Sequence, residues 1–78
     1  MQQRFDPMGF GERLLQARMN AGMTMTQVHL NVFISQTSLS RYERGLMLPT
    51  TDRLFDLANL YGCSIDWLCG LKEVDDDE

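Results

Sequence analysis

The sequence predicts an all-α fold in which five short helices form one compact domain. Its 78 residues suffice for a single core, and a hydrophobic content of 44% is ordinary for a globular chain. Apolar residues recur at helical spacing in five segments, each opened by a capping residue and several closed by glycine. No segment shows the alternation typical of a strand, and no internal repeat indicates a second domain.

The first predicted helix runs from about Pro7 to Asn20. Asp6 can cap it, because an aspartate side chain accepts hydrogen bonds from backbone N–H groups that the first turn leaves unpaired. Gly9 and Gly11 weaken the start of this helix, since glycine disfavours a helix interior. The apolar stripe that is expected to face the core consists of Phe10, Leu14, Ala17 and Ala21.

Gly22 ends the first helix, and Thr24 opens the second. Gln27 follows Thr24 by three residues, which is the spacing of a capping box, where each side chain bonds the other residue's backbone N–H group. Val28 and Val32 are expected on the inner side of this helix.

The third predicted helix runs from Gln36 to Arg44, between the cap Ser35 and Gly45, where a left-handed residue is expected. On a helical wheel, five polar residues fall within roughly 140° of one another, namely Gln36, Thr37, Ser40, Arg41 and Arg44. The other side holds Ser38, Leu39 and Tyr42. Glutamine can pair with adenine, arginine with guanine, and serine or threonine with base edges or phosphates. Any surface helix shows a polar outward face, so this composition alone leaves DNA binding open.

Thr50 caps the fourth predicted helix, which extends to about Tyr61 and is closed by Gly62. Its apolar stripe consists of Leu54, Leu57, Ala58 and Tyr61. Ser64 then caps a short fifth helix that extends to about Cys69. The second and third predicted helices, with the short turn between them, therefore lie within some 20 residues. This is the layout of a helix-turn-helix, which places one helix across a DNA backbone and the next in the groove.

The net charge of −4 is distributed unevenly along the chain. Five acidic residues lie in the last six positions, namely Glu73, Asp75, Asp76, Asp77 and Glu78. Residues 1–72 carry seven basic and six acidic residues, so their charge is +1, and nucleic acid is not excluded as a partner. The acidic end is predicted to be a solvated, disordered tail; the alternative is a tail that competes with DNA for the basic face.

The residue inventory argues against an enzyme, a cofactor and a metal site. The chain has one histidine, His29, and lacks clustered carboxylates outside the tail, a glycine-rich phosphate loop and metal-ligand spacing. His29 is interpreted as a packing histidine, with a pH switch or a ligand as the alternative.

Cys63 and Cys69 lie six positions apart in apolar surroundings, which favours two reduced structural thiols over an oxidised pair or a reactive thiol. No apolar run approaches the roughly 20 residues that span a bilayer, and no apolar segment follows the first residues as in a signal peptide. The protein is therefore predicted to be cytoplasmic, without a membrane partner.

Three stretches of the sequence carry a specific resemblance. Residues 18–24 read RMNAGMT, residues 34–45 read ISQTSLSRYERG with Pro49 and Thr50 following, and residues 60–68 read LYGCSIDWL. With these motifs the chain resembles the Cro/CI family of helix-turn-helix repressors, also called the XRE family, over nearly all of residues 10–71.

The resemblance implies a compact five-helix domain like that of lambda repressor, with the helix-turn-helix in helices 2 and 3. We expect residues 1–8 to form an N-terminal arm and the start of helix 1, residues 9–71 the domain, and residues 72–78 the tail. The implied function is a sequence-specific regulator of transcription, more often a repressor, that inserts helix 36–44 into the major groove of double-stranded DNA as a homodimer on a two-fold operator. The alternative is a protein-interaction module of the antitoxin or anti-repressor kind on the same fold.

The family's functional positions carry over onto individual residues. Those that match base-reading positions are Gln36, Thr37, Ser40 and Arg41. Those that match phosphate-contacting positions are Thr26, Gln27, Ser38, Arg44 and Thr50. Arg18 and Glu43 match a partly buried structural ion pair that ties the first helix to the end of the third.

Three residues depart from the family pattern in the predicted reading unit. Met25 stands where a glutamine commonly contacts phosphate, so Thr26 or Gln27 is expected to replace that contact. His29 stands where a small residue packs the two helices closely, and Phe33 stands where glycine often makes the turn. These two bulky residues predict crowding, with a tilted or displaced third helix as one result.

Two apolar groups allow alternative roles. Met19, Met23 and Met25 are interpreted as fillers of a small core, with an adaptable surface for a partner as the alternative. Trp67, Leu68 and Leu71 are expected either to cap the core or to build a dimer interface.

Overall fold

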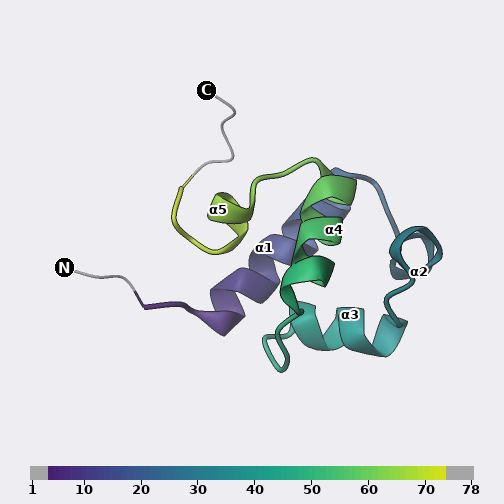
Figure 1. Ribbon diagram of the computed structural model, residues 1–78, viewed down its shortest axis with the longest axis horizontal. Helices are drawn as coiled ribbons and strands as arrows, with labels where there is room; N and C mark the ends of the chain where they lie inside the picture. The colour runs from purple at the N-terminus through teal and green to yellow at the C-terminus, as the bar shows by residue number, and fades with distance from the viewer. Residues whose placement is uncertain (1–3, 74–78) are drawn as a thin grey trace.

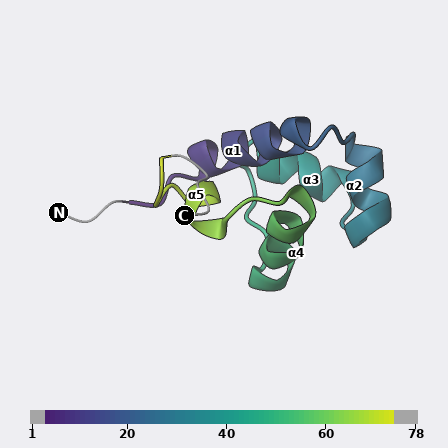
Figure 2. The same cartoon turned by 90° about the horizontal axis from the view of Figure 1, so that it is seen from above.

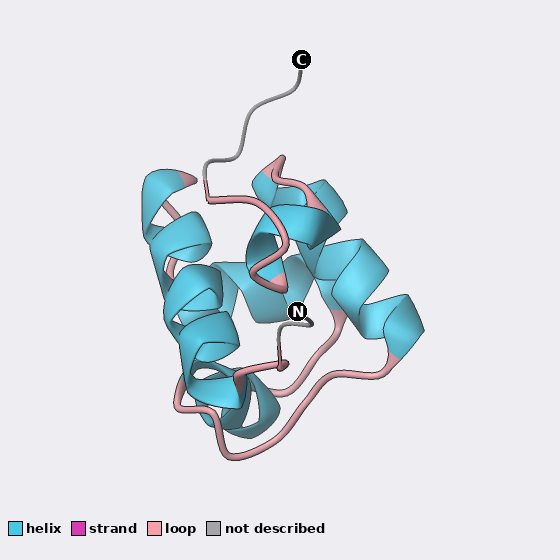
Figure 3. Cartoon of the chain, turned by 90° about the vertical axis from the view of Figure 1, so that its left-hand side faces the viewer, coloured by secondary structure: helices cyan, strands magenta, loops and turns pink. Residues whose placement is uncertain are grey.

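The structure, a computed structural model, describes residues 4–73, in which the chain forms five helices (Figure 1). They are α1 (Pro7–Asn20), α2 (Met25–Val32), α3 (Gln36–Glu43), α4 (Thr51–Tyr61) and α5 (Ile65–Leu68). Figure 3 shows only loops and turns between them, and these residues contain no strand. The predicted all-α fold is confirmed. Residues 1–3 of the predicted arm and 74–78 of the predicted tail lie outside the described residues, and the domain bounds stay a prediction.

The helices begin at the predicted capping residues. Asp6, Ser35 and Ser64 each accept a hydrogen bond from a backbone N–H group in the first turn of their helix. Thr50 also precedes its helix, but its side chain makes no capping bond to the backbone. Its hydroxyl donates instead to the Asp52 carboxylate, which holds the pKa of that carboxyl below its usual value.

The ends of the helices follow the glycine pattern, with one correction. Glycines in the left-handed region follow α1, α3 and α4, at Gly22, Gly45 and Gly62. Ala21, which the apolar stripe of the first helix included, is exposed. It is the C-terminal cap of α1, one position beyond the last helical residue, Asn20.

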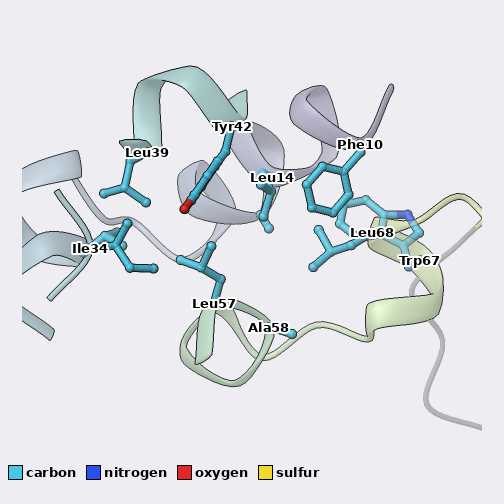
Figure 4. Close-up of a cluster of buried hydrophobic side chains, with 11 residues drawn as sticks. Phe10, Leu14, Ile34, Leu39, Tyr42, Leu57, Ala58, Trp67 and Leu68 are labelled. Atoms are coloured by element: carbon cyan, nitrogen blue, oxygen red, sulfur yellow. The ribbon is translucent and has the colours of Figure 1, made fainter. Parts of the chain in front are cut away.

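The five helices enclose one core. Helix α1 packs against α3, α4 and α5, and Figure 2 shows α2 at one end of α1 and α3, with α4 below them. Figure 4 shows Leu39 and Tyr42 pointing from α3 toward Leu57 of α4. The short helix α5 closes the core with Trp67 and Leu68, which are 9% and 0% exposed. These two residues therefore cap the core, as in the first of the two expected roles, whereas Leu71 is 67% exposed and does not.

Gly11 marks the closest approach of α1 to α3. A Cβ atom at this buried position would lie 2.6 Å from the backbone carbonyl oxygens of both Tyr42 and Glu43. The glycine that weakens α1 as an isolated helix is therefore required by the packing of its N-terminal half against the end of α3.

We expect Gly11→Ala to lower the free energy of unfolding by about 3 kcal/mol, because backbone carbonyl groups cannot move aside as a flexible side chain can. Urea denaturation followed by circular dichroism measures this loss. Gly9→Ala is the matched control within α1, since its Cβ atom would meet the end of the exposed Asp6 side chain, which can move aside at no more than the cost of its capping bond to Met8 N. Equal stability of the two variants would contradict the close approach.

Candidate nucleic-acid interface

The helix α3 presents one apolar and one polar side. Leu39 and Tyr42 are each 1% exposed and pack in the core. On the opposite side the exposed residues are Gln36, Thr37, Arg41 and Arg44, with Ser40 half-buried between them. The amphipathic pattern of residues 36–44 therefore orients this helix as the wheel predicted.

A shallow hollow lies on the outward side of α3. Its lining consists of Met25, Gln36, Thr37, Ser40, Arg41 and Arg44. The structure thus brings together all four residues predicted to read bases, together with Arg44 from the set predicted to contact phosphates. The remaining member, Met25, comes from the first turn of α2.

A hydrogen bond between the two helices holds the amide of Gln36. Its Nε2 atom donates to Thr26 Oγ1 across 3.1 Å. An amide nitrogen carries two hydrogens, so this bond does not use the second N–H or the Oε1 atom of Gln36. The sequence offered no signal for this contact, because the two side chains are ten positions apart on different helices.

The first turn of α2 is a capping box, as predicted. Thr24 N donates to Gln27 Oε1 across 2.9 Å, and Gln27 N donates to Thr24 Oγ1 across 3.1 Å. The box engages the amide oxygen of Gln27 and leaves its NH2 group as the remaining donor. This reciprocal pairing fixes the end of α2 that adjoins the hollow.

Two of the residues predicted to contact phosphates, Ser38 and Thr50, are not part of the lining of the hollow. Ser38 is half-buried, and its hydroxyl accepts a hydrogen bond from Ser35 Oγ across 3.0 Å. Thr50 is exposed before α4 and bonds Asp52. The structure therefore does not gather the five predicted phosphate contacts into one cluster.

The turn between α2 and α3 passes through Phe33 in a left-handed conformation, with φ 60° and ψ 33°. Its side chain points into solvent and is 81% exposed, so Phe33 does not crowd the two helices as the sequence predicted. The half-buried His29 bonds the Ile34 carbonyl oxygen through Nδ1 across 2.8 Å. His29 thus packs in the turn and connects α2 with the residue before the cap of α3.

We expect Phe33→Gly to raise the free energy of unfolding by about 1 kcal/mol, because glycine adopts the left-handed region without the steric cost that a phenylalanine carries. Chemical denaturation measures the change. Leu30→Gly is the matched control, since Leu30 is also exposed, at 64%, but lies inside α2. That variant should lose about 1 kcal/mol; a loss of stability in both variants would contradict strain at Phe33.

Arg18 and Glu43 form a bidentate ion pair between α1 and α3. Arg18 Nε lies 2.7 Å from Glu43 Oε2, and Nη2 lies 3.1 Å from Oε1. Arg18 Nη1 also donates to the Met23 carbonyl oxygen across 3.0 Å. The side chains are only 14% and 6% exposed, and the bond to Glu43 raises the pKa of Arg18. The pair therefore joins the end of α1, the loop before α2 and the end of α3.

We expect Glu43→Ala to lower the free energy of unfolding by about 3 kcal/mol, because it leaves a largely buried guanidinium without its carboxylate. The effect on DNA sequence preference should be smaller. Glu12→Ala removes an exposed carboxylate from α1 and should cost less than about 0.5 kcal/mol. A Glu43 variant that unfolds like the unmodified protein but selects different DNA would assign the pair to recognition instead.

Sequence reasoning did not find the contact of Arg53 with α3. Arg53 Nη1 donates to the hydroxyl of Tyr42 across 2.9 Å, which raises the pKa of Arg53. Tyr42 is 1% exposed, so the bond gives its hydroxyl a partner at the edge of the core. No motif links a tyrosine in one helix to an arginine in the next, and the contact emerges only from the packing of α4.

Both cysteines are half-buried thiols, and burial raises the pKa of Cys69. Within residues 4–73, no group of three or more His, Cys, Asp or Glu side chains could hold a metal ion. No helix in the same part of the chain is long and apolar enough to cross a membrane.

This chain is similar in sequence to several known proteins. A family model described as helix-turn-helix matches residues 14–68. The HTH-type transcriptional regulator ImmR of Bacillus subtilis (strain 168) is 43% identical over 67 residues, which cover 86% of this chain and 53% of ImmR. The cryptic phage CTXphi transcriptional repressor RstR of Vibrio cholerae serotype O1 is 37% identical over 67 residues, which cover 86% of this chain and 60% of RstR. The chain thus spans little more than half the length of these relatives.

A solved structure extends the likeness to three dimensions. It is a crystal structure of the P22 c2 repressor protein in complex with synthetic operator 9T. The two chains superpose with a TM-score of 0.75 at 25% sequence identity, over 81% of this chain and 96% of that one.

Proposed function

The chain belongs to the helix-turn-helix family, in its Cro/CI branch, and from this membership we propose that it is a cytoplasmic, sequence-specific DNA-binding regulator of transcription that acts as a repressor. The observation that carries the proposal is the hollow on α3, where the residues expected to read bases stand together on the outward side of a helix fixed by the core. The repressor–operator complex of a protein with the same fold supports this role.

In the proposed complex α3 lies in the major groove. The groove is about 12 Å wide and admits one helix, and base pairs present distinct donors and acceptors there. The free N–H and Oε1 of Gln36 suit the two-point pattern of adenine, and Arg41 suits guanine. Thr37 and Ser40 contribute hydroxyl groups next to them.

The phosphate contacts are proposed to flank this reading surface. Arg44 supplies charge at the end of α3, and Gln27 supplies the NH2 group that its capping box leaves over. The hydroxyls of Thr26 and Ser38 each accept a bond inside the protein, so the hydrogen of each can be donated to a phosphate oxygen. Thr50 already donates its hydroxyl hydrogen to Asp52, so its backbone is the better candidate for such a contact.

The proposal includes a homodimer on a two-fold operator. Residues 1–72 carry a charge of only +1, which provides few phosphate contacts per subunit. Two subunits on half-sites about one helical turn apart double the contacts and supply the missing affinity. The charge distribution therefore favours a dimer over a monomer on DNA.

The test is selection of bound molecules from a randomised duplex-DNA pool, at low salt and at about physiological salt, followed by sequencing and anisotropy titration. We expect a palindromic motif whose binding Gln36→Ala and Arg41→Ala abolish. Arg13→Ala removes the same charge as Arg41→Ala, but from α1 and away from the hollow. It should retain the motif.

Recovery of no motif at either salt would contradict the proposal. It would favour the alternative of a protein-interaction module on the same fold. A partner would then be sought at the exposed side chains of Leu30 and Phe33, at the outer end of α2.

A further inference from the structure

Met25 lies partly against the core and partly at the surface of the hollow on α3. It is the first residue of α2, is half-buried and packs against the core. It also lines the hollow on α3 together with the residues proposed to read bases. A residue that served only as core filling would not need to lie at this surface.

The chemistry of the thioether restricts what Met25 can contact there. The other five side chains of the lining end in amide, hydroxyl or guanidinium groups. A thioether is at best a weak acceptor and has no hydrogen to donate to a phosphate oxygen. Pressing it against a polar base edge would leave that edge without a hydrogen bond, which costs free energy. Its exposed part therefore needs an apolar partner.

The major groove offers one apolar group on its base edges. This group is the 5-methyl of thymine, since the other edges present nitrogen, oxygen and amino groups. On the proposed function given above, we propose that Met25 contacts the 5-methyl group of a thymine in each half-site and thereby specifies an A·T pair. Burial of this methyl group removes apolar surface from water on both partners.

Thr26, the residue after Met25, connects the proposed thymine contact to Gln36. Thr26, next to Met25 in the first turn of α2, holds the amide of Gln36 by a 3.1 Å hydrogen bond. The capping box of Thr24 and Gln27 fixes the same turn. One rigid turn therefore orients the residue proposed to read adenine and presents the apolar group proposed to read thymine, so that α2 contributes to sequence preference and not only to docking.

The test exchanges each thymine of the selected operator for deoxyuridine, which removes the 5-methyl group alone. We expect one position in each half-site where the unmodified protein binds the deoxyuridine duplex about fourfold more weakly, the effect of one buried methyl-sized group. Met25→Gln, which keeps the length of the side chain but makes it polar, should bind both duplexes with equal affinity at that position. Met25→Leu should restore the preference for thymine.

Two controls make the result specific. Met19→Gln makes the same exchange at a residue that is 65% exposed on α1, and it should keep the fourfold difference. Thermal unfolding verifies that each variant is folded at the temperature of the titration. The inference would be overturned if, on a selected operator, Met25→Gln and the unmodified protein responded equally to deoxyuridine at every position. The proposed function would then remain intact. Failure to select any operator would instead count against the proposed function itself.

Discussion

The position of α3 depends on its contact with α1. With eight residues, α3 is shorter than the roughly 12 to 15 at which an isolated helix is marginally stable in water, so its conformation and place rely on packing. The contact has two anchors. Gly11 lets the backbones approach at one point, and the Arg18–Glu43 ion pair joins the end of α1 to the same end of α3. Since Arg18 also bonds the Met23 carbonyl, this one guanidinium fixes the loop that leads into α2.

This arrangement separates the structural residues of α3 from those proposed to recognise DNA. Every position that turns inward is committed: Leu39 and Tyr42 to the core, and Glu43 to the ion pair. The side chains at the outward positions do not pack in the core, and nothing in residues 4–73 covers the hollow that they line. On the proposed function, the residues at those positions can therefore vary with the DNA sequence while the fold is kept, which is how one scaffold serves many specificities.

The sequence predicted what depends on local interactions and missed what depends on packing. Caps and terminal glycines act within one turn, so Asp6, Thr24 and Gly62 placed their helices correctly. In the sequence Gly11 predicts only a weak point in the first helix, because the path of α3 over it is needed to show why this residue must be glycine. The roles of the functional residues were inferred from resemblance. Their gathering around one hollow, and the bond of Thr26 to Gln36, required the relative placement of α2 and α3.

The sparse charge of the chain argues for selectivity rather than tight binding in general. Arg18 is neutralised by Glu43, and so one of the seven basic residues cannot contribute to the proposed phosphate contacts. Non-specific affinity comes almost entirely from neutralised phosphates, whereas discrimination comes from base edges. A subunit with few phosphate contacts would bind arbitrary DNA weakly and would gain most of its preference from the base contacts at the hollow. Because a regulator must find its operator among a vast excess of other sites, the ratio of the two affinities matters more than either one.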